Sequence, residues 1–254
     1  MIPGIVDSAV AAARSFTDEF PGDGALASRW TATRGTWTKT SGDAVTSTAA
    51  ASYPLLSFNA NTKQATILTE GGTANTFGWG AAFWVVDSNN WWAAVIDQTT
   101  YTCQVGSTTG CCACGDNGCG PDGGCGCYIC DGGGCIGNCT FVGYAGTCTY
   151  PVFGTCYSYN LKLISSVSGS ISTISTTAIT GNTSASLTVG YVQVATNSAG
   201  QITATAQMST GGTIAQIQTT PVSPNRGRRY GVIITPRTNG TQATGLERFT
   251  YAPA

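Results

Sequence analysis

The stretch that most constrains the fold runs from Phe77 to Gln98, with the sequence FGWGAAFWVV-DSNN-WWAAVIDQ. Two apolar runs, both rich in aromatic and β-branched residues and too short for ordinary helices, flank four turn-forming residues. Asx side chains tolerate left-handed backbone and bond to nearby backbone groups, which suits a tight turn. The stretch therefore predicts a β-hairpin, and its apolar character predicts a place at the centre of a sheet.

Alternation assigns the residues of the first run to two faces, because successive strand side chains point to opposite sides. One predicted face holds Phe77, Trp79, Ala81, Phe83 and Val85, and the other holds Gly78, Gly80, Ala82, Trp84 and Val86. By the same rule Trp91 and Trp92 point to opposite faces. A strand that is apolar on both faces lies between two layers or carries a binding surface on one of them.

Charge is scarce along the whole chain. Only 9% of the 254 residues are charged, and 11 basic and 12 acidic side chains give a net charge of −1. No Lys or Arg occurs from Gln64 to Leu161. This balance argues against nucleic-acid binding, and the lack of an apolar run of about 18 residues argues against membrane insertion. Thr, Ser, Gly and Ala fill the surface instead, as in β-proteins outside cells or in assembled particles.

The chain is not expected to be an enzyme, and no catalytic residue, cofactor or metal site is assigned. It contains no His, and it shows no nucleophile-elbow, Walker, zincin or dinucleotide motif. A glycoside hydrolase would need two facing carboxylates, and the central strands offer only Asp87 and Asp97.

The N-terminal residues 1–15 predict a short helix or arm, which either packs loosely or makes an assembly contact. Their apolar run is interrupted by Asp7 and has no positively charged start, so it does not read as a secretory signal.

A family resemblance begins at FTDEF (residues 16–20) and continues through PGDG, Leu26, Trp30 and Gly35-Thr-Trp37. The frame F-x-D-x-F, a Gly-rich loop, Leu-x-x-x-Trp and Gly-x-Trp resembles the opening of concanavalin A-like (laminin-G-like) jelly-roll domains. Such domains are frequent in minor tail and fibre proteins of double-stranded DNA bacteriophages. Later strands of the family match GWGAAFWVVDSNNWWAAVI and the segments 157–163, 227–235 and 246–253. The resemblance implies that the closing strand pairs with the first, placing Phe249 and Tyr251 near Phe16 and Phe20.

Alternation alone points to the same fold class. Ile202, Ala204, Ala206 and Met208 alternate with polar residues, as do Tyr157, Tyr159, Leu161 and Leu163. We therefore predict an all-β, two-sheet antiparallel jelly-roll sandwich formed by residues 16–102 and 157–254. Residues 103–156 form a Cys/Gly-rich insertion in this sandwich.

The insertion contains every cysteine of the chain and too few aliphatic residues for a core, so cross-links must hold it together. Six disulfides are favoured over zinc, although Cys111/Cys114, Cys127/Cys130 and Cys135/Cys139 have the spacing of thiolate pairs. Cys103 and Cys156 flank strands expected to run side by side, so we predict a disulfide between them at the neck. The twelve predicted half-cystines are Cys103, Cys111, Cys112, Cys114, Cys119, Cys125, Cys127, Cys130, Cys135, Cys139, Cys148 and Cys156.

Three further groups are candidate ligand sites. An aromatic platform for sugar rings is predicted from Trp79, Trp84, Trp91, Trp92 and Tyr101, although core packing explains about half of them. The cluster Arg226, Arg228 and Arg229 is either a solvated turn or a contact for an anionic partner. The side chains of Asp116, Asn117, Asp122 and Asp131 are either turn residues or oxygen ligands for Ca²⁺.

These features favour a structural component of a bacteriophage virion, such as a tail fibre, baseplate or minor tail protein. We expect it to form a homo-oligomer and to contact host-surface glycans or neighbouring virion subunits. The virion would carry it outside the cell after host lysis, which suits a cysteine-rich chain. The alternatives are a capsid decoration (cement) protein and a secreted carbohydrate-binding module, but the latter would need an export signal.

Overall fold

The computed structural model describes residues 14–40, 43–46, 53–71, 78–111, 126–130, 139–144, 147–179, 189–208, 212–221, 224–235 and 245–254. These residues form strands, turns and loops without a helix, which confirms the all-β prediction. The predicted arm at residues 1–15 lies outside the described residues, apart from Arg14 and Ser15. The strands are β1 (Phe16–Asp18), β2 (Thr31–Arg34), β3 (Trp37–Thr40), β4 (Asp43–Thr46), β5 (Leu55–Asn59), β6 (Ala65–Gly71), β7 (Trp79–Asp87), β8 (Asn90–Cys111), β9 (Gly126–Cys130), β10 (Cys139–Tyr144), β11 (Thr147–Val167), β12 (Ser170–Ile179), β13 (Val189–Thr196), β14 (Ile202–Met208), β15 (Thr213–Thr219), β16 (Arg229–Ile234) and β17 (Gly245–Pro253).

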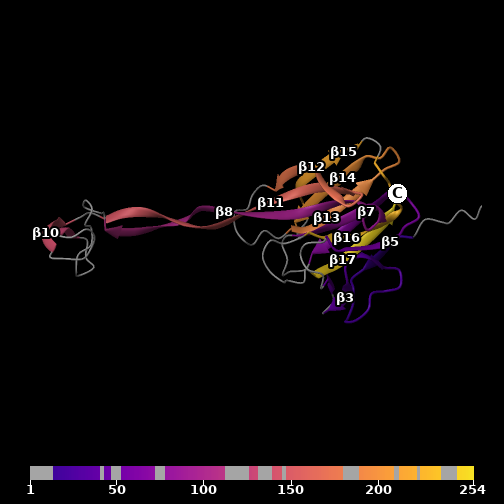
Figure 1. The fold of residues 1–254 in the computed structure, drawn as a ribbon, viewed down its shortest axis with the longest axis horizontal. Helices are drawn as coiled ribbons and strands as arrows, with labels where there is room; N and C mark the ends of the chain where they lie inside the picture. Colours follow the sequence, from indigo (N-terminus) through magenta and orange to yellow (C-terminus); the bar gives the residue numbers. More distant parts are fainter. Residues whose placement is uncertain are drawn as a thin grey trace, which may run out of the picture. The chain divides into compact units, whose positions relative to one another are not determined.

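Two large antiparallel sheets build the sandwich (Figure 1). Sheet A has eight strands in the order β15-β14-β13-β6-β17-β4-β3, with β1 also paired to β17. Sheet B has seven, in the order β12-β11-β8-β7-β16-β5-β2, and a small third sheet joins β9 to β10. The chain divides into two compact units, Met1–Thr99 with Tyr157–Ala254, and Thr100–Cys156.

The predicted hairpin is confirmed at the middle of sheet B. Strands β7 and β8 pair with Phe83 opposite Trp92 and Asp87 opposite Asn90. The Asp87 carboxylate accepts the backbone N–H of Asn89 at 2.7 Å, and it also accepts the Asn90 side-chain amide. These hydrogen bonds hold the pKa of Asp87 below its ordinary value, so their contribution to the turn is lost as the pH falls through that lowered pKa.

The hairpin turn is also tied to the turn between β11 and β12. The backbone carbonyl of Asn89 accepts hydrogen bonds from the Ser166 hydroxyl at 2.7 Å and from the Gly169 N–H at 3.0 Å. The side-chain oxygen of Asn90 accepts the Ser168 N–H at 3.0 Å. The asparagines of DSNN therefore connect two neighbouring turns as well as forming one.

The predicted faces are correct from Trp79 to Phe83 and wrong for Trp84 and Val85, while Phe77 lies outside the described residues. A β-bulge follows Phe83, and Trp84 adopts a positive φ of 49°. A bulge places two residues opposite one residue of the partner strand, so the side chains after it change faces. Trp84 consequently joins Phe83 in the main core, while Val85 moves to the opposite face.

The main hydrophobic core lies between the two large sheets. It takes Ile67, Val192 and Val194 from sheet A and Ala81, Phe83 and Trp92 from sheet B, among others. A smaller buried cluster on the other face of sheet B contains Ala82, Trp91, Ala93 and Val95. Trp91 and Trp92 thus point to opposite faces, as the alternation predicted.

The first and last strands meet as the family resemblance implied. Phe16 lies opposite Tyr251 and Asp18 lies opposite Phe249 in the β1–β17 pair. An aromatic cluster forms around them, in which the ring centroids of Phe16 and Phe58 are 4.9 Å apart and those of Trp30 and Phe249 are 5.2 Å apart. Fully buried Phe20 also belongs to this cluster, with its ring centroid 5.6 Å from that of Trp30.

Asp18 explains the acidic position of the F-x-D-x-F frame. One carboxylate oxygen accepts the backbone N–H of Phe20 at 3.0 Å, and the other accepts the indole N–H of Trp30 at 2.7 Å. The first bond holds Phe20 at a positive φ of 48°, an uncommon conformation for a bulky residue. Asp18 therefore fixes both the end of β1 and the orientation of Trp30.

The Cys-rich unit has the predicted disulfide at its neck. Cys103 on β8 and Cys156 on β11 are bonded, with their Cα atoms 5.8 Å apart and 53 positions apart in sequence. Two residues further along, Val105 lies so close to Gly154 that a Cβ on that glycine would be 2.9 Å from the Val105 side chain. Cys111, Cys127, Cys130, Cys139 and Cys148 lie on strands β8 to β11, whereas Cys112, Cys114, Cys119, Cys125 and Cys135 lie outside the described residues, as do Asp116, Asn117, Asp122 and Asp131.

Removal of the Asp18 carboxylate should destabilise the sandwich. We expect Asp18→Ala to lower the free energy of unfolding by about 2–4 kcal/mol, because two N–H donors near the core lose their acceptor. Urea denaturation measures this change. The matched control is Glu19→Ala, an exposed neighbour expected to change stability by less than about 0.5 kcal/mol. Equal stability of the two variants would contradict the role given to Asp18.

Loss of the neck disulfide should affect the two units differently. Closing a loop of this length contributes about 4 kcal/mol in the chain-entropy model. We expect the double variant Cys103→Ala, Cys156→Ala to expose residues 100–156 to limited proteolysis while the sandwich fragments stay resistant. If the reduced wild-type segment stays resistant and becomes sensitive only after a chelator is added, thiolate-bound metal rather than disulfides holds this unit.

The register of the small sheet predicts a second cross-link. Cys130 and Cys139 are directly opposed in the antiparallel β9–β10 pair. Opposed Cα atoms in such a pair lie about 4.5–5.5 Å apart, within the range of a disulfide. We expect mass spectrometry of a non-reduced peptic digest to find these two cysteines linked, with the Cys103–Cys156 peptide as internal control. A peptide joining Cys130 to any other cysteine would contradict this pairing.

Candidate binding surface

The four tryptophans of the predicted aromatic platform are buried. Trp79, Trp84 and Trp91 are at most 1% exposed, and Trp92 is 7% exposed. The Trp84 indole donates to the backbone carbonyl of Lys63 at 2.9 Å, and the Trp91 indole donates to that of Ser88 at 3.2 Å. Core packing thus accounts for all four rings rather than for half of the set, and they form no exposed platform.

Tyr101 is the fifth predicted platform residue and belongs to the Cys-rich unit, where it is 45% exposed. That unit also exposes Val105, Val152 and Phe153. The structure therefore places the predicted sugar-binding aromatics in two different environments instead of on one surface.

The arginine cluster does not act as a single patch. Arg226 donates to the backbone carbonyl of Ser198 at 3.3 Å and lies over the Trp84 ring, 5.5 Å from its centroid. Arg228 is exposed, whereas the Nε atom of Arg229 is buried. Exposed Arg228 agrees with the solvated-turn interpretation, whereas Arg229 begins β16 and has a buried Nε.

The two carboxylates of the central hairpin have structural partners. Asp87 forms the turn, and Asp97 forms an ion pair with Lys162 on the neighbouring strand β11. Within the described part of the chain, no group of three or more His, Cys, Asp or Glu side chains is arranged to hold a metal ion.

Sequence reasoning missed a broad polar surface on the outer side of sheet A, which we call the Gln/Thr face. Alternate residues of β13, β14 and β15 point into the core, so the residues between them point outward. The β6 and β17 residues continue the same rows across the sheet. The face consists of Thr66, Leu68, Glu70, Tyr191, Gln193, Ala195, Thr203, Gln207, Gln216, Gln218, Arg248, Thr250 and Ala252, with the Thr205 position buried among them.

The register aligns these side chains in rows. Leu68, Gln193 and Thr205 lie side by side on successive strands, with Gln216 at the end of the row. In the adjacent row the Gln207 amide donates to the side-chain oxygen of Gln193 at 3.3 Å. Amides and hydroxyls can both donate and accept hydrogen bonds, so this face offers paired donors and acceptors without net charge.

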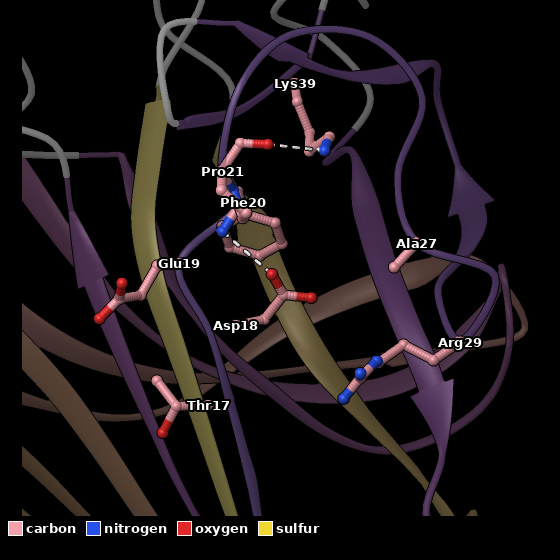
Figure 2. Close-up of a pocket in the computed structure, with 8 residues that line it drawn as sticks. All are labelled: Thr17, Asp18, Glu19, Phe20, Pro21, Ala27, Arg29 and Lys39. Carbon is pink, nitrogen blue, oxygen red and sulfur yellow. Dashed lines mark hydrogen bonds between the residues drawn. The ribbon is translucent and has the colours of Figure 1, made fainter.

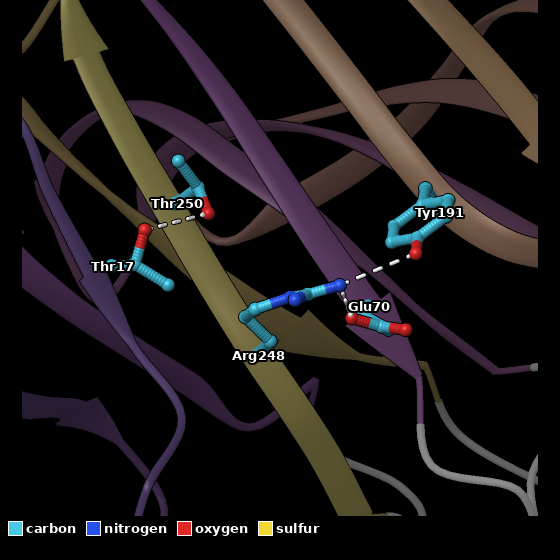
Figure 3. Close-up of polar contacts among 5 residues, drawn as sticks. All are labelled: Thr17, Glu70, Tyr191, Arg248 and Thr250. Carbon is cyan, nitrogen blue, oxygen red and sulfur yellow. Dashed lines mark hydrogen bonds and ion pairs between the residues drawn. The ribbon is translucent and has the colours of Figure 1, made fainter. Parts of the chain in front are cut away.

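The face carries two charges, and they neutralise each other. Arg248, Glu70 and Tyr191 are neighbours in one row across β17, β6 and β13 (Figure 3). The Arg248 guanidinium forms an ion pair with Glu70, donates to the Tyr191 hydroxyl at 3.2 Å and lies 5.8 Å from the centre of that ring. Tyr191 is thereby held in place as a half-buried aromatic ring within a polar surface.

A surface hollow adjoins the Gln/Thr face at strand β1 (Figure 2). Thr17 lines this hollow of about 560 Å³, and its hydroxyl is hydrogen bonded to that of Thr250 at 3.2 Å. Lys39 also lines the hollow, and its ammonium donates to the Pro21 carbonyl at 2.7 Å. Arg29 lies on its other side, and Asp18 and Glu19 also line it, so charges of both signs border the neutral face here.

A polar alternation in the sequence is the signal that would have identified the Gln/Thr face. Gln193 and Gln216 each lie between two core residues of a strand, and Gln207 and Gln218 each follow one. The apolar residues of the alternating pattern form the core, and the polar residues between them form the outward surface.

Comparison with known proteins gives a likeness to solved structures alone. No protein-family model and no curated protein matches the chain. Among solved structures, the chain is similar to the CBM2 module of the evolved Dit of Lactobacillus casei BL23 phage J-1, with 7% sequence identity and a TM-score of 0.41. The match covers 94% of this chain and 96% of that one. In the described residues no helix is long and apolar enough to span a membrane.

Proposed function

We propose that the protein is a non-enzymatic structural component of a bacteriophage virion, located on the tail, which contacts host-surface glycans through its Gln/Thr face. The observation that carries this proposal is a wide outward sheet face built from amides, hydroxyls and one positioned tyrosine, without net charge. Glycans present closely spaced hydroxyls and flat C–H faces, which such groups match.

The character of the chain supports a particle protein. A surface with few charges, no His and a disulfide-closed unit suits a protein that works outside the cell. The sequence resemblance to jelly-roll domains of phage tail proteins supports the tail as its location. A homo-oligomer on the particle would add several weak glycan contacts together, which raises overall binding without tight individual sites.

The ion pair of Asp97 with Lys162 and the role of Asp87 in its turn support the non-enzymatic part of the proposal. Glycoside hydrolysis needs two free carboxyl groups about 5–10 Å apart on either side of the bond. The two central-strand carboxylates are engaged in holding the sheet together.

Removal of outward amides should weaken glycan binding without unfolding the protein. We expect the double variant Gln193→Ala, Gln216→Ala to reduce binding on a glycan array by about tenfold, since each lost hydrogen bond contributes about 0.5–1.5 kcal/mol. The matched control is Gln104→Ala, which removes an exposed glutamine outside the face. Tyr191→Ala should also reduce binding, through loss of the ring.

Different outcomes would contradict different parts of the proposal. Undiminished binding by the Gln193 and Gln216 variant would show that another surface holds the glycan. A chain that binds no glycan, yet restores stability to particles lacking it, would show contact with neighbouring virion subunits instead. Release of sugar fragments from host polysaccharide would contradict the absence of enzymatic activity.

A further inference from the structure

A second hollow, of about 380 Å³, lies beside the one in Figure 2 and has a different chemical character. Its lining residues are Arg14, Ser15, Phe16, Arg29, Phe58 and Asn59. The lining thus supplies two guanidinium groups, a hydroxyl, an amide and two aromatic rings, but no carboxylate. Positive charge is therefore concentrated in this hollow, in a chain that has little charge elsewhere.

Arg29 is held in place without a salt bridge. Its guanidinium carbon lies 4.5 Å from the centre of the Phe16 ring, and Phe16 is itself fixed in the aromatic cluster with Phe58. Stacking on a ring leaves the N–H donors of an arginine available at its edge. Among the described residues, the ion pairs join Lys162 to Asp97 and Arg248 to Glu70, and neither involves Arg29.

Asp18 and Glu19 line the larger hollow together with Arg29, but neither forms a salt bridge with it. Both oxygens of Asp18 are engaged, by the Phe20 N–H and by the Trp30 indole. Figure 2 shows the Glu19 side chain on the opposite side of Asp18 from the Arg29 guanidinium. The lining of the second hollow itself contains no acid, so an anionic group entering it would meet Arg14 and Arg29.

The hollow is also connected to the Gln/Thr face. Arg29 lines both hollows, and Thr17 of the larger one is hydrogen bonded to Thr250 of that face. A chain molecule bound along the face could therefore extend over β1 and place a substituent beside Arg29.

We infer that the hollow of Arg14 and Arg29 binds an anionic substituent, a carboxylate or a phosphate, of the glycan held by the Gln/Thr face. This inference rests on the proposed function and names the ligand class: an acidic polysaccharide rather than a neutral one. Arginine suits this role because its planar N–H pair matches two oxygens of a carboxylate or phosphate.

The test compares three polymers on the full-length protein: dextran, which is neutral; alginate, which carries carboxylates; and poly(glycerol phosphate). We expect one anionic polymer to bind more tightly than dextran, and its identity distinguishes carboxylate from phosphate. The double variant Arg14→Gln, Arg29→Gln should weaken binding to that polymer by about tenfold and leave dextran binding unchanged. Binding to the anionic polymer should also fall as salt is raised.

Arg228→Gln is the matched control, because it removes one exposed positive charge outside the hollow. It should leave all three affinities unchanged, which separates local recognition from general attraction to polyanions. Both lost arginines are exposed, and an unchanged melting temperature would confirm that the double variant is folded.

The outcomes separate the inference from the proposed function. Equal binding of the three polymers, insensitive to Arg14→Gln and Arg29→Gln, would overturn the inference and leave glycan binding intact. An equal loss on Arg228→Gln would also overturn it, because the effect would then come from overall charge. Failure of all three polymers to bind would overturn the proposed function and the inference with it.

Discussion

The pairing of the chain's two ends at β1 and β17 is the constraint on which the sandwich depends. Strand β17 lies between β6 and β4 in sheet A and also pairs with β1, so the last strand joins parts of the sheet that are far apart in sequence. Its Phe249 and Tyr251 complete the aromatic cluster around Phe16 and Phe58. Sheet A is incomplete until the C-terminal strand pairs with β1, β4 and β6, so its folding depends on non-local contacts.

The fold was predictable from the sequence where local pattern and packing agree. The hairpin turn chemistry of Asp87 to Asn90, the alternation of β14 and the aromatic positions of the two end strands all appear as short-range patterns. The face of Trp84 was not predictable, because its position depends on distant partners. Its backbone carbonyl accepts the Gly227 N–H at 3.2 Å, and its indole donates to the backbone carbonyl of Lys63. The alternation of side chains along one strand gives no information about either contact.

The same limit explains why the tryptophans predicted to form a binding platform lie in the core instead. Tryptophans attract attention as sugar-stacking groups, but in this sandwich they fill the space between and behind the sheets. The outward positions hold glutamine and threonine, which are ordinary residues for an exposed strand. Their significance appears only when the register aligns them across β6, β13, β14 and β15 into a continuous face. Strand order is a tertiary property that one strand's pattern does not contain.

Because the chain has few charged side chains, each of them has a large influence on the local electrostatics. Electrostatic attraction in physiological salt extends about 8 Å, so a cation is cancelled chiefly by acids within that range. Arg248 has Glu70 as its ion-pair partner and Lys162 has Asp97, and each pair contributes to holding neighbouring strands. Arg29 instead stacks on Phe16 and lines two hollows. A neutral face can bind many hydroxyl-rich polymers with similar strength, whereas an arginine without a salt bridge at its margin favours those that carry negative charge. In the proposed complex, the amide and hydroxyl rows of the Gln/Thr face therefore supply contact area. Arg29 supplies the selectivity for anionic polymers that these rows lack.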